Sequence, residues 1–227
     1  MPDLPFDAVI LDCDSTLSRI EGVDELARRR GVGAEIAALT DRAMQGLVPL
    51  ESVYAQRLDI IRPDRDLVAW LGGRYVETLV PGAAALVSAL QALGKEVHVV
   101  SGGILQAVRV LAEALRVPDA NVHAVEVRFG PDGSFAGYAE DSLLARSGGK
   151  GKVARHIARG RRLAAVGDGV TDLEMQEAGA VLIGFGGVAI RELVRERADV
   201  WIEDASLESV LPHLLTSLER GRSATPG

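Results

Sequence analysis

Cysteine is almost absent from this chain: Cys13 is its single example in 227 residues. A lone thiol cannot close an internal disulfide, and zinc cages built on several sulfurs are excluded as well. Long hydrophobic runs are also missing, since none approaches the ~20 apolar residues of a bilayer-spanning helix. The start MPDLPFDAVIL carries no basic stretch ahead of its short apolar run, so we expect no secretory signal. Together these absences predict a soluble cytoplasmic protein.

Positive charge is in deficit. Lys and Arg number 25 against 32 Asp and Glu, a formal net charge of −7, and no Lys/Arg tract offsets it locally. Nucleic acid is therefore a poor candidate partner. Hydrophobic residues make up 48% and charged residues 25%, the usual mixture of a folded globular domain. This composition does not distinguish an enzyme from a binding module.

Short apolar runs alternate with helical patterns along most of the chain. Strands are predicted at residues 6–11, 96–101, 163–167, 180–185 and 199–203, with amphipathic helices between them. Strands alternating with helices predict an α/β fold with a parallel, doubly wound sheet. Residues 122–129 and 134–138 flank Pro-Asp-Gly, which predicts a β-hairpin.

The stretch between the first strand and Pro81 has only helical patterns, broken by Gly and Pro. We therefore predict a Rossmann-like core of residues 1–16 and 81–218, with an inserted helical cap at 17–80 that could act as a lid. Residues 219–227 are polar and rich in small side chains, which is typical of a loose tail.

Acidic residues follow two of the predicted strands. Asp12 and Asp14 end the first strand, and Asp168 follows the strand at 163–167. Open α/β sheets bind ligands at the carboxyl ends of their strands, so these carboxylates can converge. Oxygen ligands without sulfur favour Mg²⁺. An Asp-x-Asp pair alone is also common in solvated loops, so the inference depends on the residues that accompany it.

Two glycine-containing segments complete the pattern. Ser101, Gly102 and Gly103 end a predicted strand and begin a predicted helix, where a hydroxyl and free N–H groups can bind an anion. Lys150 lies among the glycines of GGKGK, ahead of another helix, and can approach a phosphate closely. Each segment alone is as well explained by an N-cap or a surface lysine. Asp, Ser, Lys and Asp in this order at strand ends are harder to attribute to chance.

The segments DCDST, SGG, GGKGK and GDGVTD resemble the four motifs of the haloacid dehalogenase superfamily. The stretches EGVDELA, RAMQGLVPLESVYAQRLDIIRP, SGGKGKV and IGFGGVAIRELV are similar to phosphoserine phosphatases of the animal and plant type, over nearly the whole chain. This resemblance implies a Rossmann-like core with a C1-type helical cap, and a magnesium-dependent phosphomonoester hydrolase.

The resemblance also implies a role for individual residues. Asp12 would be the nucleophile and Asp14 the general acid and base. Mg²⁺ would be held by Asp12, Asp168 and the main-chain carbonyl of Asp14, with Asp172 orienting these ligands. The substrate would be bound by Ser101, Gly102, Gly103 and Lys150 around the phosphate and by Glu21, Met44, Arg57, Thr171 and Arg191 around the rest.

The expected reaction is hydrolysis of O-phospho-L-serine to L-serine and phosphate through an aspartyl-phosphate, the last step of serine biosynthesis. The ammonium and carboxylate of this substrate call for an acid and a fork-shaped cation, which Glu21 and Arg57 can supply. Met44 would shield the phosphate from bulk water. The expected partner is thus a small phosphomonoester, with neither nucleic acid nor a membrane, and the protein would be a monomer or a homodimer.

Three alternatives stay open at this point. Cys13 and Arg19 fit the Cys-x₅-Arg pattern of a cysteine phosphatase, although the flanking Asp12 and Asp14 would raise the pKa of the thiol. A phosphate-responsive receiver-like module also uses strand-end acids and a lysine. Finally, Val125-Glu126-Val127 and Ile104 depart from the family pattern, where Asn-Arg-Leu and Phe are common, so another small phosphomonoester could be the substrate. The four histidines show no metal-pair spacing, and we expect them to be packing or surface residues.

Overall fold

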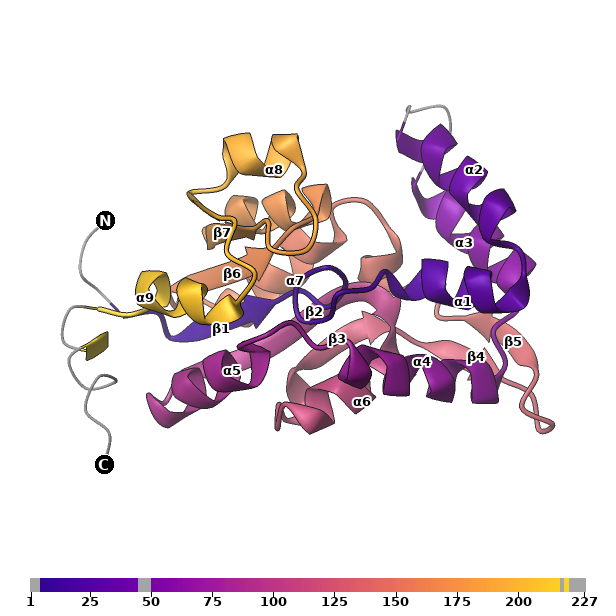
Figure 1. Ribbon diagram of the computed structural model, residues 1–227, viewed down its shortest axis with the longest axis horizontal. Coiled ribbons are helices and arrows are strands. Elements are labelled where there is room, and N and C mark those ends of the chain that lie inside the picture. The colour runs from indigo at the N-terminus through magenta and orange to yellow at the C-terminus, as the bar shows by residue number, and fades with distance from the viewer. Residues whose placement is uncertain (1–4, 45–49, 217–218, 221–227) are drawn as a thin grey trace.

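The computed structural model describes residues 5–44, 50–216 and 219–220, and the side chains of residues 40–44 and 50–51 lie outside that description. Strands in the described residues are β1 (Ala8–Leu11), β2 (Glu96–Ile104), β3 (Val122–Val125), β4 (Val127–Phe129), β5 (Phe135–Tyr138), β6 (Leu163–Gly167), β7 (Val181–Phe185) and β8 (Val200–Ile202). Six of them form a parallel sheet in the order β3-β2-β1-β6-β7-β8. The predicted doubly wound α/β core is confirmed (Figure 1).

Helices cover both faces of this sheet. Beyond the insertion, the helices are α5 (Ala83–Ala92), α6 (Leu105–Ala114), α7 (Gly149–Ala158), α8 (Glu192–Arg197) and α9 (Leu211–Leu214), with 3-10 turns η1 (Asp119–Asn121), η2 (Leu143–Ala145), η3 (Val170–Ala178) and η4 (Leu207–Val210). Alternate residues of β1 point to opposite faces: Val9 packs in the cluster under α5 and α6, and Ile10 in the cluster under α7 and η3. Buried on both faces, the strand reads as a continuous apolar run.

The predicted helical insertion follows β1. It consists of α1 (Gly22–Arg30), α2 (Gly33–Met44), α3 (Leu50–Ile61) and α4 (Arg65–Glu77). Asp64 caps α4 by accepting a hydrogen bond from the Leu67 N–H at 2.8 Å, as an N-cap aspartate does. Figure 1 shows α2 and α3 projecting away from the sheet, whereas α4 lies along α6. A Cβ at Gly72 would come 2.8 Å from the Val110 side chain, so the glycine allows this close packing.

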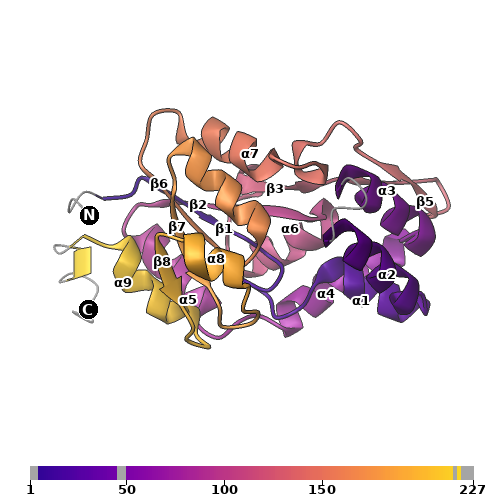
Figure 2. The same ribbon diagram turned by 90° about the horizontal axis from the view of Figure 1, so that it is seen from above.

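Two predicted boundaries were wrong. The strand predicted at 96–101 continues through Gly102 and Gly103 to Ile104, so these glycines lie in β2 rather than at a helix N-terminus. The hairpin is formed by β4 and β5 alone, since residues 122–125 pair in parallel with β2 in the main sheet. The break falls at Glu126, which belongs to neither strand: Val125 pairs with β2, whereas Val127 pairs with β5. Figure 2 shows the β4–β5 hairpin beside the inserted helices.

The first residue of the expected tail is anchored. Glu219 accepts a hydrogen bond from the buried Lys95 Nζ at 2.7 Å and from the Thr216 N–H at the same distance. Lys95 also donates a hydrogen bond to the Phe6 carbonyl at 3.1 Å. Glu219 therefore neutralises a buried cation at the amino-terminal ends of β1 and β2. Residues 221–227 of the tail lie outside the description. Among the described helices, none has the length and apolar character needed to cross a bilayer.

Candidate active site

A cavity of about 350 Å³ lies where β1, β2 and β6 end, under the inserted helices. Because neighbouring parallel strands end at the same edge of the sheet, their following residues meet there. The Asp12 N–H continues the sheet by donating to the Val166 carbonyl at 3.0 Å. This places the acid after β1 beside Asp168, the acid after β6, as the sequence predicted.

We use the word floor for four side chains: Asp12, Lys150 and Asp168, which line the cavity, and Asp172, which is fully buried and contacts Lys150. The Lys150 Nζ lies 2.7 Å from Asp12 Oδ1 and 2.7 Å from Asp172 Oδ1. One carboxylate oxygen from each of the three aspartates lies within 4.8 Å of the others, in an arrangement that could hold a metal ion. Asp172 is fully buried and also accepts the Gly169 N–H at 2.9 Å, which fixes its orientation. The floor therefore combines a buried cation with three converging carboxylates.

Burial of this many carboxylates disfavours their charged forms. Burial, and then the charge of Asp172, raises the pKa of Asp168 to about 6, although Arg191 opposes the shift. Burial likewise raises the pKa of Asp12, with Asp172 adding to the shift and Lys150 opposing it. Burial opposes the charged form of Lys150, but Asp12 and Asp172 together raise its pKa, so its ammonium form is secure. Lys150 pairs with Asp12 and Asp172, and Arg191 pairs with Asp168, so two cations face three carboxylates. A divalent cation would neutralise the remaining negative charge.

Asp14 has a different environment two residues further on. Its Oδ1 accepts hydrogen bonds from the Tyr75 hydroxyl and from the Gly22 N–H, both at 2.7 Å. Burial, and then the charge of Glu21, nevertheless raises the pKa of Asp14 to about 7. A carboxyl group that titrates near neutrality can both donate and accept a proton, as general acid–base catalysis requires. Position 22 must be glycine here, because a Cβ would lie 2.0 Å from the Tyr75 hydroxyl.

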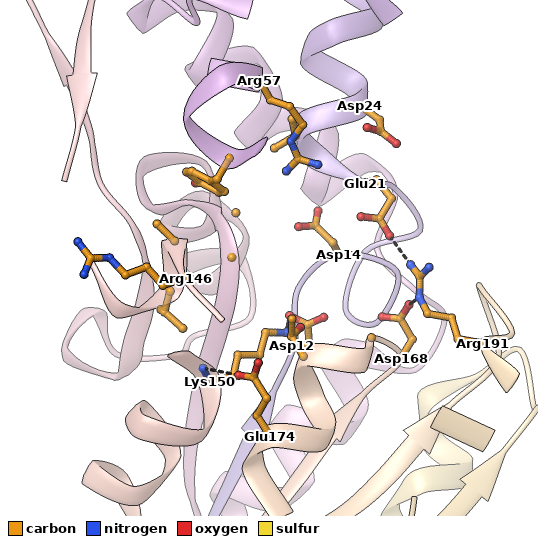
Figure 3. A pocket seen from close by; sticks show the side chains of 18 residues that line it. Asp12, Asp14, Glu21, Asp24, Arg57, Arg146, Lys150, Asp168, Glu174 and Arg191 are labelled. Atoms are coloured by element: carbon orange, nitrogen blue, oxygen red, sulfur yellow. Dashed lines mark hydrogen bonds and ion pairs between the residues drawn. The ribbon is translucent and has the colours of Figure 1, made fainter. Parts of the chain in front are cut away.

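Arg191 connects the sheet side of the cavity with the insertion. Its Nε donates to Asp168 Oδ2 at 2.9 Å and its Nη2 to Glu21 Oε1 at 3.0 Å (Figure 3). Glu21 also accepts the Ser15 hydroxyl at 2.8 Å. Thr171 lines the cavity beside them. The predicted residues from both parts of the chain are thus brought to one cavity.

Two residues of α3, Tyr54 and Arg57, line the cavity on the side of the insertion. We call these two residues the roof. Figure 3 shows Arg57 extending from α3 toward Asp14. Buried polar atoms of both roof residues, the Tyr54 hydroxyl and the Arg57 Nε, have no hydrogen-bond partner within the part of the chain that the structure describes. The roof thus holds donors that the described protein leaves unpaired.

Other predicted residues are placed less directly. Gly102 and Gly103 line the cavity, whereas the buried Ser101 hydroxyl accepts the Gly103 N–H at 2.9 Å. The side chain of Met44 lies outside the described residues. Val125 and Val127 join the core, and Glu126 is exposed. Among the described residues that line the cavity, none belongs to Val125-Glu126-Val127 or is Ile104.

Sequence reasoning missed several residues at this site. Glu174 accepts the N–H groups of Gly148 and Lys150 at 2.8 and 3.2 Å, and so holds the start of α7. The Thr16 hydroxyl donates to Asp168 Oδ1 at 3.1 Å. Tyr54 could have been found from helical spacing, because it lies three residues before Arg57 and shares its helix face. No pattern in the sequence marks the contact of Tyr75 with Asp14, which are 61 residues apart.

Cys13 is unsuited to the alternative thiol chemistry. It is fully buried within the main hydrophobic cluster. Burial, and then the charges of Asp14 and Asp12, raises the pKa of its thiol well above the ordinary value. A nucleophilic cysteine needs the opposite, an exposed thiol with a lowered pKa. The structure therefore supports a packing role for Cys13.

The chain matches the haloacid dehalogenase-like hydrolases over residues 9–177. It is 41% identical to phosphoserine phosphatase of Mus musculus over 201 residues, which cover 87% of this chain and 89% of the mouse protein. It is 39% identical to the chloroplastic phosphoserine phosphatase of Arabidopsis thaliana, over 86% of this chain and 68% of that protein.

Solved structures agree with these sequence comparisons. A phosphoserine phosphatase determined as an analogue of the phospho-aspartyl intermediate superposes with a TM-score of 0.76 at 28% identity, covering 93% of this chain and all of that one. The chain therefore belongs to the haloacid dehalogenase-like hydrolases and, within them, to the phosphoserine phosphatase family.

Proposed function

We propose that this protein hydrolyses O-phospho-L-serine to L-serine and phosphate, with Asp12 as the nucleophile. The observation that carries the proposal is the pairing of Asp12, held by Lys150 at the cavity floor, with Asp14, whose pKa of about 7 suits proton transfer. The phosphoserine phosphatases of mouse and Arabidopsis and the phospho-aspartyl analogue structure support the substrate and the intermediate.

In the first step, an oxygen of the Asp12 carboxylate attacks phosphorus in line with the serine oxygen. The new O–P bond forms an aspartyl-phosphate as the serine O–P bond breaks. Protonated Asp14 gives its proton to the departing serine oxygen, so serine leaves as the neutral alcohol. Lys150 lies within ion-pair distance of Asp12 and offsets the negative charge gathered there.

In the second step, Asp14, now ionised, takes a proton from a water molecule. That water attacks phosphorus, the bond between Asp12 and phosphorus breaks, and phosphate is released. Asp14 is protonated again and ready for another cycle. Tyr75 and the Gly22 N–H keep its carboxyl group in place throughout, since both contact Oδ1.

Magnesium fits the floor of the cavity. The donors are carboxylate oxygens without sulfur, they converge within 4.8 Å, and the two cations that contact them do not cancel their three charges. Asp12 and Asp168 would hold the ion with the Asp14 carbonyl, and Asp172 would orient them. When bound, Mg²⁺ would supply charge neutralisation at the transferring phosphoryl group.

The remaining cavity residues suit the serine part of the substrate. Arg57 can pair with the carboxylate, and Glu21 with the ammonium, while Gly102 and Gly103 accompany Lys150 at the phosphate. Ser101 would act there from just behind the cavity wall, where its hydroxyl contacts the Gly103 N–H. We propose that residues 17–80 form the cap that encloses the substrate, with Met44, Thr171 and Arg191 on the substrate side. A cytoplasmic location is part of the same proposal.

A substrate panel tests this function. We expect kcat/KM with Mg²⁺ to be highest for phosphoserine among phosphoserine, phosphothreonine, phosphoethanolamine and sugar phosphates. Preference for a sugar phosphate would instead favour a phosphatase for another small phosphomonoester. A single stoichiometric phosphorylation without turnover of any of them would favour a receiver-like module.

A further inference from the structure

The Tyr54 hydroxyl is a buried polar group with no role in the mechanism above. Tyr54 is 6% exposed and lines the cavity, and among the described residues its hydroxyl has no hydrogen-bond partner. Buried hydroxyls are nearly always paired, because burial without a partner sacrifices their hydrogen bonds to water. An unpaired hydroxyl at the wall of a substrate cavity therefore indicates a partner supplied by the ligand.

The tyrosine ring is held in place by the protein. It packs edge-on against Tyr138 of the β4–β5 hairpin, with ring centroids 5.4 Å apart and planes at 61°. This geometry is one that aromatic pairs prefer. Burial raises the pKa of Tyr54, so its hydroxyl stays protonated at neutral pH and can donate a hydrogen bond.

Arg57 determines what kind of group the hydroxyl can meet. It lies three residues further along α3, lines the same cavity, and has its own unpaired buried Nε. The positive charge of Arg57 repels an ammonium group and attracts an anion. Figure 3 shows Lys150 at the opposite end of the cavity from Arg57. The proposed function places the phosphate at Lys150, and Glu21 and Asp24 offer carboxylates to an ammonium. The anion that remains for the roof is the substrate carboxylate.

We propose that Tyr54 is a specificity-determining residue, whose hydroxyl donates a hydrogen bond to the substrate carboxylate beside Arg57. This inference rests on the proposed function, because it assumes an amino-acid phosphate in the cavity. A hydrogen bond to a charged group strengthens binding affinity by about 10–100-fold, so the loss of affinity on removing the hydroxyl should be measurable.

The test compares wild type with Tyr54→Phe on phosphoserine and on phosphoethanolamine, which lacks the carboxylate. We expect Tyr54→Phe to lower kcat/KM for phosphoserine by about tenfold or more, mainly through KM, and to leave phosphoethanolamine unchanged. Tm should stay equal or rise, because an unpaired buried hydroxyl is removed. Tyr138→Phe is the matched control, because the Tyr138 ring packs on Tyr54 but is not among the described residues that line the substrate cavity.

Equal losses on both substrates, or no loss on phosphoserine, would overturn the role of Tyr54. A fall on phosphoserine with Tyr138→Phe as large as that with Tyr54→Phe would also overturn it, because the effect would then come from packing. Failure of the proposed function would be seen separately, in the wild type. A wild-type enzyme with a higher kcat/KM for phosphoethanolamine than for phosphoserine would not recognise the substrate carboxylate, and the proposed function would be wrong.

Discussion

The floor and the roof of the cavity satisfy their polar groups in opposite ways. On the floor, the Lys150 ammonium contacts two aspartates and Arg191 contacts the third, so every carboxylate touches a cation within the protein although negative charge remains in excess. On the roof, buried polar atoms of Tyr54 and Arg57 have no partner among the described residues. This difference is what the proposed function requires: the floor would serve a reaction common to many phosphate esters, whereas the roof would be completed by one kind of ligand.

The largest effect should come from the nucleophile. Asp12→Asn keeps the size of the side chain and removes the attacking oxygen anion, so we expect turnover to fall by roughly 10⁴-fold or more. Initial rates with phosphoserine and Mg²⁺ measure this. Cys13→Ser is the neighbouring control and should retain nearly full activity, since Cys13 is a buried packing residue. The reverse pattern would assign the chemistry to the thiol.

Removing the cation of the floor should cost stability as well as activity. Lys150→Met leaves Asp12 and Asp172 buried without their partner, a change that typically destabilises by about 3–5 kcal/mol. Urea denaturation in metal-free buffer measures the free energy of unfolding. Arg57→Met on the roof should change this free energy by less than about 1 kcal/mol, because Arg57 forms no ion pair with any described residue. Similar losses in the free energy of unfolding for both variants would contradict the conclusion that floor and roof differ in how their charges are paired.

The roof should instead control substrate preference. Arg57→Ala should lower kcat/KM for phosphoserine by about 10–100-fold, because it removes a charged hydrogen-bond donor for the carboxylate. Activity on phosphoethanolamine should change far less. Parallel losses on the two substrates would mean that Arg57 acts on the phosphate or on folding.

The smallest effect concerns the pH dependence of the enzyme. Asp14 must be protonated to donate to the leaving group, so kcat/KM should fall as pH rises through its pKa of about 7. The hydrogen bond from Tyr75 favours the ionised form and lowers this pKa. Tyr75→Phe should therefore move the fall to higher pH, by about half to one unit. A shift toward lower pH would contradict this account of Asp14.

Much of the fold could be predicted because its signals are local. Alternating apolar and helical patterns identify the parallel core, and the absence of strand patterns before Pro81 identifies the helical insertion. The end of β2 was missed because glycines usually signal a break, whereas Gly102 and Gly103 continue the strand and Gly103 packs closely against polar side chains, including that of Tyr75. The sequence could not show whether the departures at Val125-Glu126-Val127 alter the substrate pocket. Only the structure shows that the side chains of Val125 and Val127 enter the hydrophobic core instead.

By itself the sequence determined which chemical groups stand at the ends of the strands, because a buried strand followed by polar residues presents them at one edge of the sheet. It determined the acids after β1 and β6 and the lysine of the glycine-rich segment in this way. Only the tertiary structure decided the pKa of Asp14 and the unpaired state of the roof. Both depend on burial and on residues distant in the chain, such as Tyr75, and neither leaves a pattern in the sequence.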